Sequence, residues 1–413
     1  MQNFRIKLSL YINYFVFAIL LNSVGIVIAK SIKVYGVDEK QASILEAFKD
    51  LPIAIVSFIV ASFLPRFGYK KAMQLALLIV FLGCLGMRWG NSFWAAKLMF
   101  LSVGVSFALI ELSVYSLVGV VTETPQQHSA LMSSIEGFFM VGIASAYFLF
   151  PAFYSDTAQN AWLNVYLLLA ALVLLSFLFL SFSGINIKAE TAGKNWKEDI
   201  IASLRLIIIP LVLVFIFSAF FFVMIEQGIM TWLPRFNEKI FSFSERLSVQ
   251  MASILAISLA AGRFLAGWLS KKISWSVIVI GCAVLAVILL LAILPRLRAA
   301  DQIVTLSSLS DVPMLGFVLP LIGLFIAPIY PLLNSTVLSH LPKSLHSPMS
   351  GLIIIFSALG GTIGSRIVGT LFKNIGGVKA FYFLVIPIVL LIISVLIIQR
   401  LIKKGEPQGN HPH

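Results

Sequence analysis

The sequence predicts an all-α membrane protein with twelve transmembrane helices in two six-helix bundles. The chain of 413 residues is 60% hydrophobic and only 11% charged, with a mean hydropathy of +1.00. Soluble domains average about 45–50% apolar and about 25% charged residues. The apolar residues fall into blocks of roughly twenty, the length that a helix needs to cross about 30 Å of hydrocarbon. Two similar basic loops, separated by roughly half the chain, indicate an internal duplication.

Charged or turn-rich breaks delimit the predicted spans. In the first half we expect them near 8–29, 41–64, 72–90, 94–121, 130–153 and 162–183. In the second half we expect them near 207–235, 247–270, 275–294, 314–339, 347–372 and 378–401. The first block is too long for the core of a typical signal peptide, so we expect a retained helix.

The longest charged stretch lies between the sixth and seventh spans and predicts a cytoplasmic connector at 187–206. The predicted bundles are then residues 1–186 and 207–402, followed by a polar cytoplasmic tail at 403–413. The net charge of +13 comes from basic residues scattered among hydrophobic blocks, which favours contact with anionic lipid rather than nucleic acid. The small excess of basic residues on the inner loops places both termini in the cytoplasm of a plasma membrane, such as a bacterial inner membrane.

The basic loops read LPRFGYKK at 64–71 and GRFLAGWLSKK at 262–272, and each lies between the second and third spans of its half. A duplicated transporter has this organisation. The twelve spans and paired loops resemble the major facilitator superfamily of secondary transporters. In the first loop Pro65 stands where that family usually has an acidic residue. The resemblance assigns gating to loop residues of both copies: Arg66, Gly68, Lys70, Lys71, Gly262, Arg263 and Gly267.

A shorter segment, LIELSVY at 109–115, resembles the fucose/glucose–galactose permease branch of that superfamily. In that branch the glutamate of this segment carries the coupled proton, so the resemblance assigns proton coupling to Glu111. The branch has an aspartate late in the first span, and Asn22 occupies that region here. We therefore include Asn22 among the candidate substrate-binding residues.

Charged residues within the spans are the other site candidates, because a charge near the bilayer centre costs roughly 2.5–3.5 kcal/mol on insertion scales. Glu46, Lys49 and Asp50 share one helix face and can pair within it. They form either a self-neutralised cluster lining the outer vestibule or a substrate site and outer gate. Glu111 has no basic residue within a helical turn. It either exchanges a proton, because burial disfavours its charged form, or makes a structural hydrogen bond or ion pair.

The remaining candidates are spread over the fifth, seventh, tenth and eleventh spans. Glu136 lies nearer the cytoplasm, and we expect it to pair at an inner gate. Gly228 permits a local break in the seventh span, and Trp232 offers a flat apolar face for a sugar ring or marks the outer interface. Three prolines should bend the tenth span. The further candidates are Glu226, Gln227 and Asn334 for substrate and Arg366 for gating, with the glycines of the eleventh span serving helix packing.

No phosphate-binding loop, metal-ligand spacing or nucleophile–base pair is evident, so we expect no enzyme, no cofactor and no metal site. Cys84 and Cys282 each lie inside an apolar block and offer no disulfide framework. We expect a monomer that moves a small polar solute, with protons as the coupling ion. The first hypothesis is proton-coupled uptake of a sugar or sugar derivative. The alternatives are transport or export of a charged or amphipathic compound (an organic anion, amino-acid-like solute, siderophore or drug), and a receptor-like protein without transport.

Overall fold

The computed structural model describes residues 2–60, 64–122, 124–183, 205–297, 305–341 and 346–405. In these ranges the chain is almost entirely helical, which confirms the predicted all-α class. Eleven helices of the described part are long and apolar enough to cross a membrane. The predicted second span adds a further helix, α4 (Ile44–Val60), which has only 17 residues and carries three charged side chains.

The first half of the chain contains the predicted spans one to six. Two of its long helices, α7 (Phe93–Val121) and α8 (Pro125–Ala152), begin at a side-chain cap. Ser92 accepts a hydrogen bond from the Ala95 backbone N–H, and Thr124 accepts one from that of Gln127. The helices are α1 (Gln2–Asn22), α2 (Val24–Tyr35), α3 (Glu39–Ala42), α4, α5 (Leu64–Phe67), α6 (Tyr69–Gly90), α7 (Phe93–Val121), α8 (Pro125–Ala152), η1 (Ala161–Asn164) and α9 (Val165–Ser181).

The second half contains spans seven to twelve. Its helices are α11 (Pro210–Ile240), α12 (Glu245–Leu269), α13 (Trp275–Ile293), η2 (Leu294–Arg296), η3 (Leu309–Asp311), α14 (Met314–Val318), η4 (Leu319–Leu321), α15 (Ile322–Ile326), α16 (Ile329–Ser339), α17 (His346–Ile375), α18 (Gly377–Tyr382) and α19 (Val385–Gly405). The tenth span is divided into α14 to α16, as its prolines predict, because proline removes a helical hydrogen bond and crowds the preceding turn.

Two local predictions need correction. The first span is longer than 8–29 and is divided at Ser23 into α1 and α2. The seventh span is one continuous helix, and Gly228 does not break it. A side chain at Gly228 would approach Leu384 and Val368, so this glycine serves close packing of α11 against neighbouring helices.

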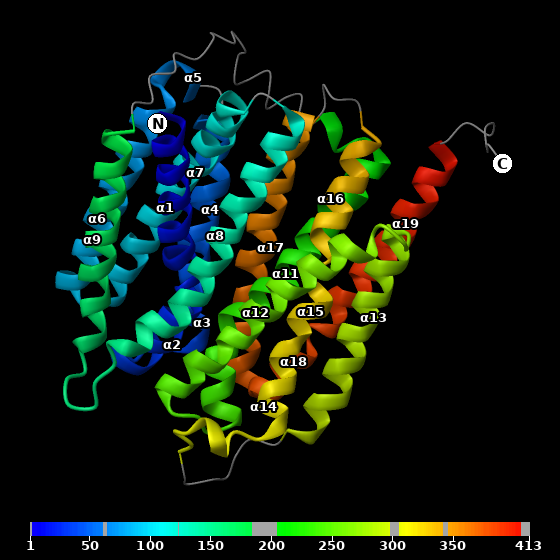
Figure 1. Cartoon of the computed structure of the whole chain (residues 1–413). Helices are drawn as coiled ribbons and strands as arrows, with labels where there is room; N and C mark the ends of the chain where they lie inside the picture. The colour runs from blue at the N-terminus through cyan, green and yellow to red at the C-terminus, as the bar shows by residue number, and fades with distance from the viewer. Residues whose placement is uncertain are drawn as a thin grey trace.

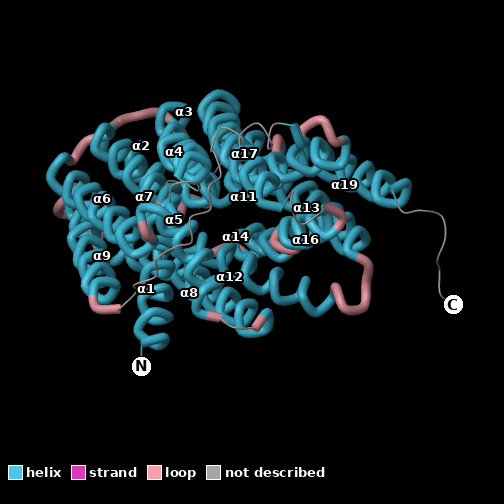
Figure 2. The backbone as a smooth tube through the Cα atoms, turned by 90° about the horizontal axis from the view of Figure 1, so that it is seen from above, coloured by secondary structure: helices cyan, strands magenta, loops and turns pink. Residues whose placement is uncertain are grey.

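The helices form two groups that meet along a central seam (Figures 1 and 2). Across this seam α4 packs against α17, α8 against α12, and α2 against α11. The α4/α17 and α8/α12 contacts lie on opposite sides of the molecule in Figure 2. The first residues of α1 and the last of α19 lie at one end of the molecule, which we call the terminal end (Figure 1). Most of the predicted connector and tail lies outside the described residues.

The eleventh span approaches the seventh closely, as its glycines predict. A Cβ at Gly360 would meet the Phe220 carbonyl, and one at Gly364 would meet Met224. Small residues let two helix backbones approach within the membrane. This contact fixes α11, which carries several of the residues described next.

Candidate functional site

A central cavity of about 330 Å³ lies between the two groups of helices. Six helices supply its walls: α1, α4, α7 and α8 from the first half, and α11 and α12 from the second. Eight residues predicted from the sequence line this cavity: Asn22, Lys49, Asp50, Glu111, Glu136, Glu226, Gln227 and Arg263. The structure therefore brings most of the buried charges to one place.

A buried ionic cluster forms one wall of the cavity. The Lys49 Nζ atom lies 2.7 Å from Glu46 Oε2 and 3.4 Å from Asp50 Oδ1, so the predicted pairing within α4 is present. Glu46 lies behind the cavity wall, is fully buried, and accepts a hydrogen bond from Thr231 of α11. The cluster thus ties the two halves together. It lies at the central cavity rather than in an outer vestibule.

The second wall carries Glu111 on α7. No ion pair of Glu111 is present among the described residues, and the Tyr115 hydroxyl lies 3.5 Å from its Oε1 atom. Glu136 of α8 is close enough to Glu111 for their negative charges to repel one another. A proton on one of these carboxyls would relieve that repulsion. The wall is thus suited to bind and release a proton.

The third wall comes from α11 and α12. The Arg263 Nη2 atom lies 3.6 Å from Glu226 Oε1, and its Nη1 atom contacts the Met140 sulfur of α8 across the seam. Glu136 lines the cavity near Arg263, and the inner-gate pairing expected for Glu136 stays a prediction. Gln227 lies beside Glu226 on the same wall.

Three polar atoms at the cavity wall have no hydrogen-bond partner within the described part of the chain. They are the Tyr14 hydroxyl, Asp50 Oδ2 and Arg263 Nε. Buried polar groups are costly to leave unpaired, and the great majority have a partner in proteins. These atoms therefore mark positions where water or a polar solute can bind.

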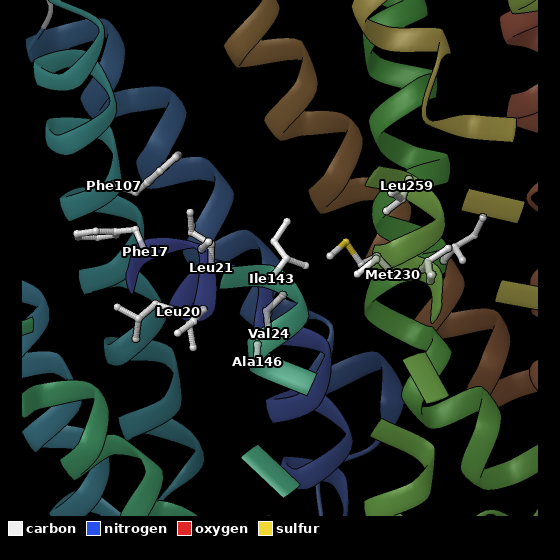
Figure 3. Packing of buried hydrophobic residues seen from close by; sticks show 14 of the residues in the cluster. Phe17, Leu20, Leu21, Val24, Phe107, Ile143, Ala146, Met230 and Leu259 are labelled. Atoms are coloured by element: carbon white, nitrogen blue, oxygen red, sulfur yellow. The ribbon is translucent and has the colours of Figure 1, made fainter. Parts of the chain in front are cut away.

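Apolar and aromatic side chains complete the cavity. Leu21 and Ile143 from the first half face Met230 and Leu259 from the second, as Figure 3 shows. Beside them the rings of Tyr14, Phe107 and Phe139 contact one another, with centroids 5.8 to 6.2 Å apart. The site therefore combines charged groups with an aromatic wall.

Ion pairs close the seam at the end of the molecule opposite the terminal end, which we call the closed end. Glu245 at the start of α12 lies 2.5 Å from Lys30 and 3.0 Å from Lys33 of α2. Arg235 of α11 lies 2.9 Å from Glu39 of α3. All ion pairs between the halves that involve described residues lie at this end.

Further polar contacts reinforce the closed end. Lys373 of α17 lies 2.8 Å from Asp38 and holds the pKa of that carboxyl below its ordinary value of 3.8. Arg366 donates hydrogen bonds to the Lys40 carbonyl and the Ser43 hydroxyl, so it bridges the halves. It does not pair with the acids of the second span.

Several predicted site residues lie outside the cavity. Trp232 is fully buried, donates from Nε1 to Ser365, and stacks on Phe372. Asn334 lies on α16 and does not line the cavity. The predicted sugar platform and tenth-span ligand are therefore not part of the site in this state.

Except for Arg263, the described residues of the basic loops lie away from the cavity as well. Lys70 donates to the Ser181 carbonyl and ties α6 to the end of α9. Gly68 has a positive φ of 91° that suits the turn before α6, and Gly262 lets α12 approach α15. Lys71 and Gly267 are exposed. The Arg66 side chain lies outside the described part of the chain.

Sequence reasoning missed the two tyrosines and the cross-seam partners. Tyr115 follows Glu111 by four residues and therefore shares its helix face, which is a signal that the sequence contains. Tyr14, Thr231 and Lys30 have no such local signal. Lys30 and its partner Glu245 are 215 residues apart, so only the folded chain reveals their pairing.

Comparison with known proteins decides the family. The sequence profile of the Major Facilitator Superfamily matches residues 10–365. The chain belongs to this superfamily. The protein therefore has the fold of a transporter, and it is not an enzyme. No curated protein matches the sequence.

Solved structures of the superfamily share the fold at low identity. A bacterial homologue of the human lysosomal transporter Spinster, in an inward-facing and occupied conformation, has a TM-score of 0.76 and 14% identity, with 98% of each chain covered. A D-xylose–proton symporter has a TM-score of 0.73 and 12% identity, covering 96% of this chain and 97% of the other. The superfamily transporter FucP, in its outward conformation, has a TM-score of 0.66 and 15% identity, covering 96% and 99%.

The ion pairs of the closed end give a direct prediction for this superfamily member. In Glu245→Gln, Lys30 and Lys33 lose their partner, so the closed end should open more often. If the closed arrangement loses about 1–2 kcal/mol of stabilisation, the ratio of open to closed molecules changes by a factor of about 5–30. The measurement is labelling of an Ile143→Cys cavity cysteine by an impermeant reagent added at the closed end.

The matched control is Glu238→Gln, because the ion pair of Glu238 with Arg235 stays within α11. Both proteins carry alanine at Cys84 and Cys282. Equal labelling rates for the two glutamine variants would show that Glu245 does not hold the seam.

Proposed function

We propose that the protein is a proton-coupled secondary transporter whose solute binds in the central cavity between the two bundles. The carrying observation is the cavity itself. Residues of both halves line it, and ion pairs close it at one end only among the described residues. Rocking of the two halves about a fixed central site is the mechanism expected for such a fold.

We propose Glu111 as the proton carrier. It lines the cavity, lacks a described ion-pair partner, and lies near a second carboxylate, Glu136. Tyr115 can donate a hydrogen bond to Glu111 in its charged form. The Glu111 carboxyl can thus bind a proton from one side of the membrane. It can release that proton when the solute binds or when the cavity opens to the opposite side.

The charge of the cavity favours a solute that carries a positive charge, such as an amine or an amino sugar. Four carboxylates line the cavity, against two cationic side chains. The aromatic wall of Tyr14, Phe107 and Phe139 adds ring faces that attract cations. A cation near Glu111 would compete with its proton, so we propose exchange of the solute for a proton.

Uptake of a neutral sugar with a proton is the second candidate. Asn22 and Gln227 line the cavity and offer amide groups that bind hydroxyls. Two of the structural relatives are a D-xylose–proton symporter and a fucose–proton symporter. One observation counts against a sugar: none of the described residues that line the cavity supplies an indole ring, because Trp232 is buried elsewhere.

The two candidates predict proton movement of opposite sign. Purified protein in liposomes would be given neutral sugars, amino sugars, amines and organic anions, each added outside, while the internal pH is followed. Exchange of an entering cation predicts protons leaving the lumen, whereas symport of a sugar predicts acidification. If no solute class causes more proton movement than it causes in protein-free liposomes, the proposed function is overturned.

A further inference from the structure

A second hollow, which we call the lateral groove, lies between α8 and α12 and has a volume of about 670 Å³. Apolar and small side chains form most of it: Gly137, Val141 and Ala144 from α8, and Ile257, Ala260 and Phe264 from α12. This volume lies in the range of small-molecule sites, which often occur between the helices of bundles.

The lateral groove opens on the outer surface of the helix bundle. Val141 and Ile257 are each 57% exposed, and Phe264 is 82% exposed. The α8/α12 contact is on one side of the molecule, away from the α4/α17 contact (Figure 2). Because both helices are membrane spans, exposed apolar residues at this position face lipid chains.

The groove adjoins the central cavity. Glu136, Met140, Ala256 and Arg263 line both hollows. The charged groups Glu136 and Arg263 therefore stand where the apolar groove meets the polar cavity. A molecule spanning the two would place an apolar part against α8 and α12 and a polar part near Glu111.

We propose that the transported solute is amphipathic, with a charged head in the central cavity and an apolar tail in the lateral groove. This inference rests on the proposed function. The occupant is the tail of the solute, because the groove adjoins the charged site and shares Glu136 and Arg263 with it. Access from the bilayer between α8 and α12 follows, since the groove is open to lipid.

The test uses permanently charged probes that carry the same head on tails of different length: tetramethylammonium, butyltrimethylammonium and octyltrimethylammonium. Affinity is measured with the full chain in detergent, with correction for probe in micelles. In the wild type the affinity should rise by at least about tenfold from the shortest to the longest tail, because methylene groups leave water.

Gly137→Phe should remove this gain, because its ring would fill the groove. The matched control is Gly281→Phe on α13. An added Cβ meets nothing within 4 Å at either glycine, and both positions are exposed. Gly281→Phe should retain the dependence on tail length. The inference would be overturned if the wild type bound the three probes with equal affinity. It would also be overturned if the gain in affinity with tail length survived in Gly137→Phe.

A second measurement does not depend on the folding of Gly137→Phe. A Val141→Cys variant, with alanine at both native cysteines, is modified with and without the probes. Octyltrimethylammonium should slow the modification, whereas tetramethylammonium should not. If the Val141→Cys thiol is already protected from modification in lipid nanodiscs and octyltrimethylammonium does not change that protection, a membrane lipid occupies the groove. That result would overturn the inference.

The outcomes separate the two proposals. If tetramethylammonium binds and moves protons while the tail adds nothing, only the groove inference fails. If no probe binds and none of the amines moves protons, the proposed cationic solute fails with it.

Discussion

Replacing Glu111 with glutamine is expected to abolish solute-driven proton movement in proteoliposomes. Glutamine keeps the shape of the side chain but cannot exchange a proton. It also removes a negative charge from the cavity. Affinity for a cationic solute should fall at least about tenfold, since a unit charge at contact distance in a partly buried site is worth more than about 1.4 kcal/mol.

The pH dependence of binding makes this prediction sharper. In the wild type a cationic solute should bind more weakly at acidic pH, because protonated Glu111 has lost its charge. In Glu111→Gln the affinity should be much less dependent on pH. Asp156→Asn, which neutralises an exposed carboxylate between α8 and η1, is the control and should behave as the wild type. A wild-type proton signal in Glu111→Gln would move the coupling role to another carboxylate.

Replacing Lys49 with methionine is expected to destabilise the protein by about 3–5 kcal/mol, the cost of removing one partner from a buried ionic pair. Lys49 is 4% exposed and Glu46 is fully buried, so both carboxylates of the cluster would lose their counter-charge inside the protein. Thermal or denaturant unfolding in detergent measures the loss.

Neutralising the acids tests the cause of that loss. A triple variant with Lys49→Met, Glu46→Gln and Asp50→Asn should recover much of the stability, because no uncompensated charge remains. Lys373→Met is the control, since its ion pair with Asp38 is largely exposed and such pairs are worth about 0–1 kcal/mol. If the triple variant is no more stable than Lys49→Met, the loss comes from packing rather than charge.

The membrane fold could be predicted from the sequence because hydrophobic length alone nearly determines a spanning helix. The exceptions have physical causes. The second span has a short helix with three charges, and the first is divided at Ser23, a residue that does not by itself signal a break. The positions of such breaks depend on tertiary contacts that a local pattern does not contain.

The site could be predicted in part, because buried charges must face a cavity or a partner. This argument led to Asp50, Glu111 and Arg263, all of which line the cavity. Trp232 rests on a separate argument, its flat apolar face, and it does not line the cavity. The helical period contained the warning. At 3.6 residues per turn, Trp232 lies about 140° around α11 from Gln227, so the two cannot share one face. The cross-seam pairs depend on how the halves dock, and no local spacing encodes that.

Proton release on solute binding tests the proposed exchange most directly. The cationic solute with the largest signal in proteoliposomes is added to purified protein in a weakly buffered detergent solution, and the change in pH is recorded. The account predicts that the wild type releases protons and that Glu111→Gln does not. Proton uptake, or a release that is equal in the two proteins, would contradict it.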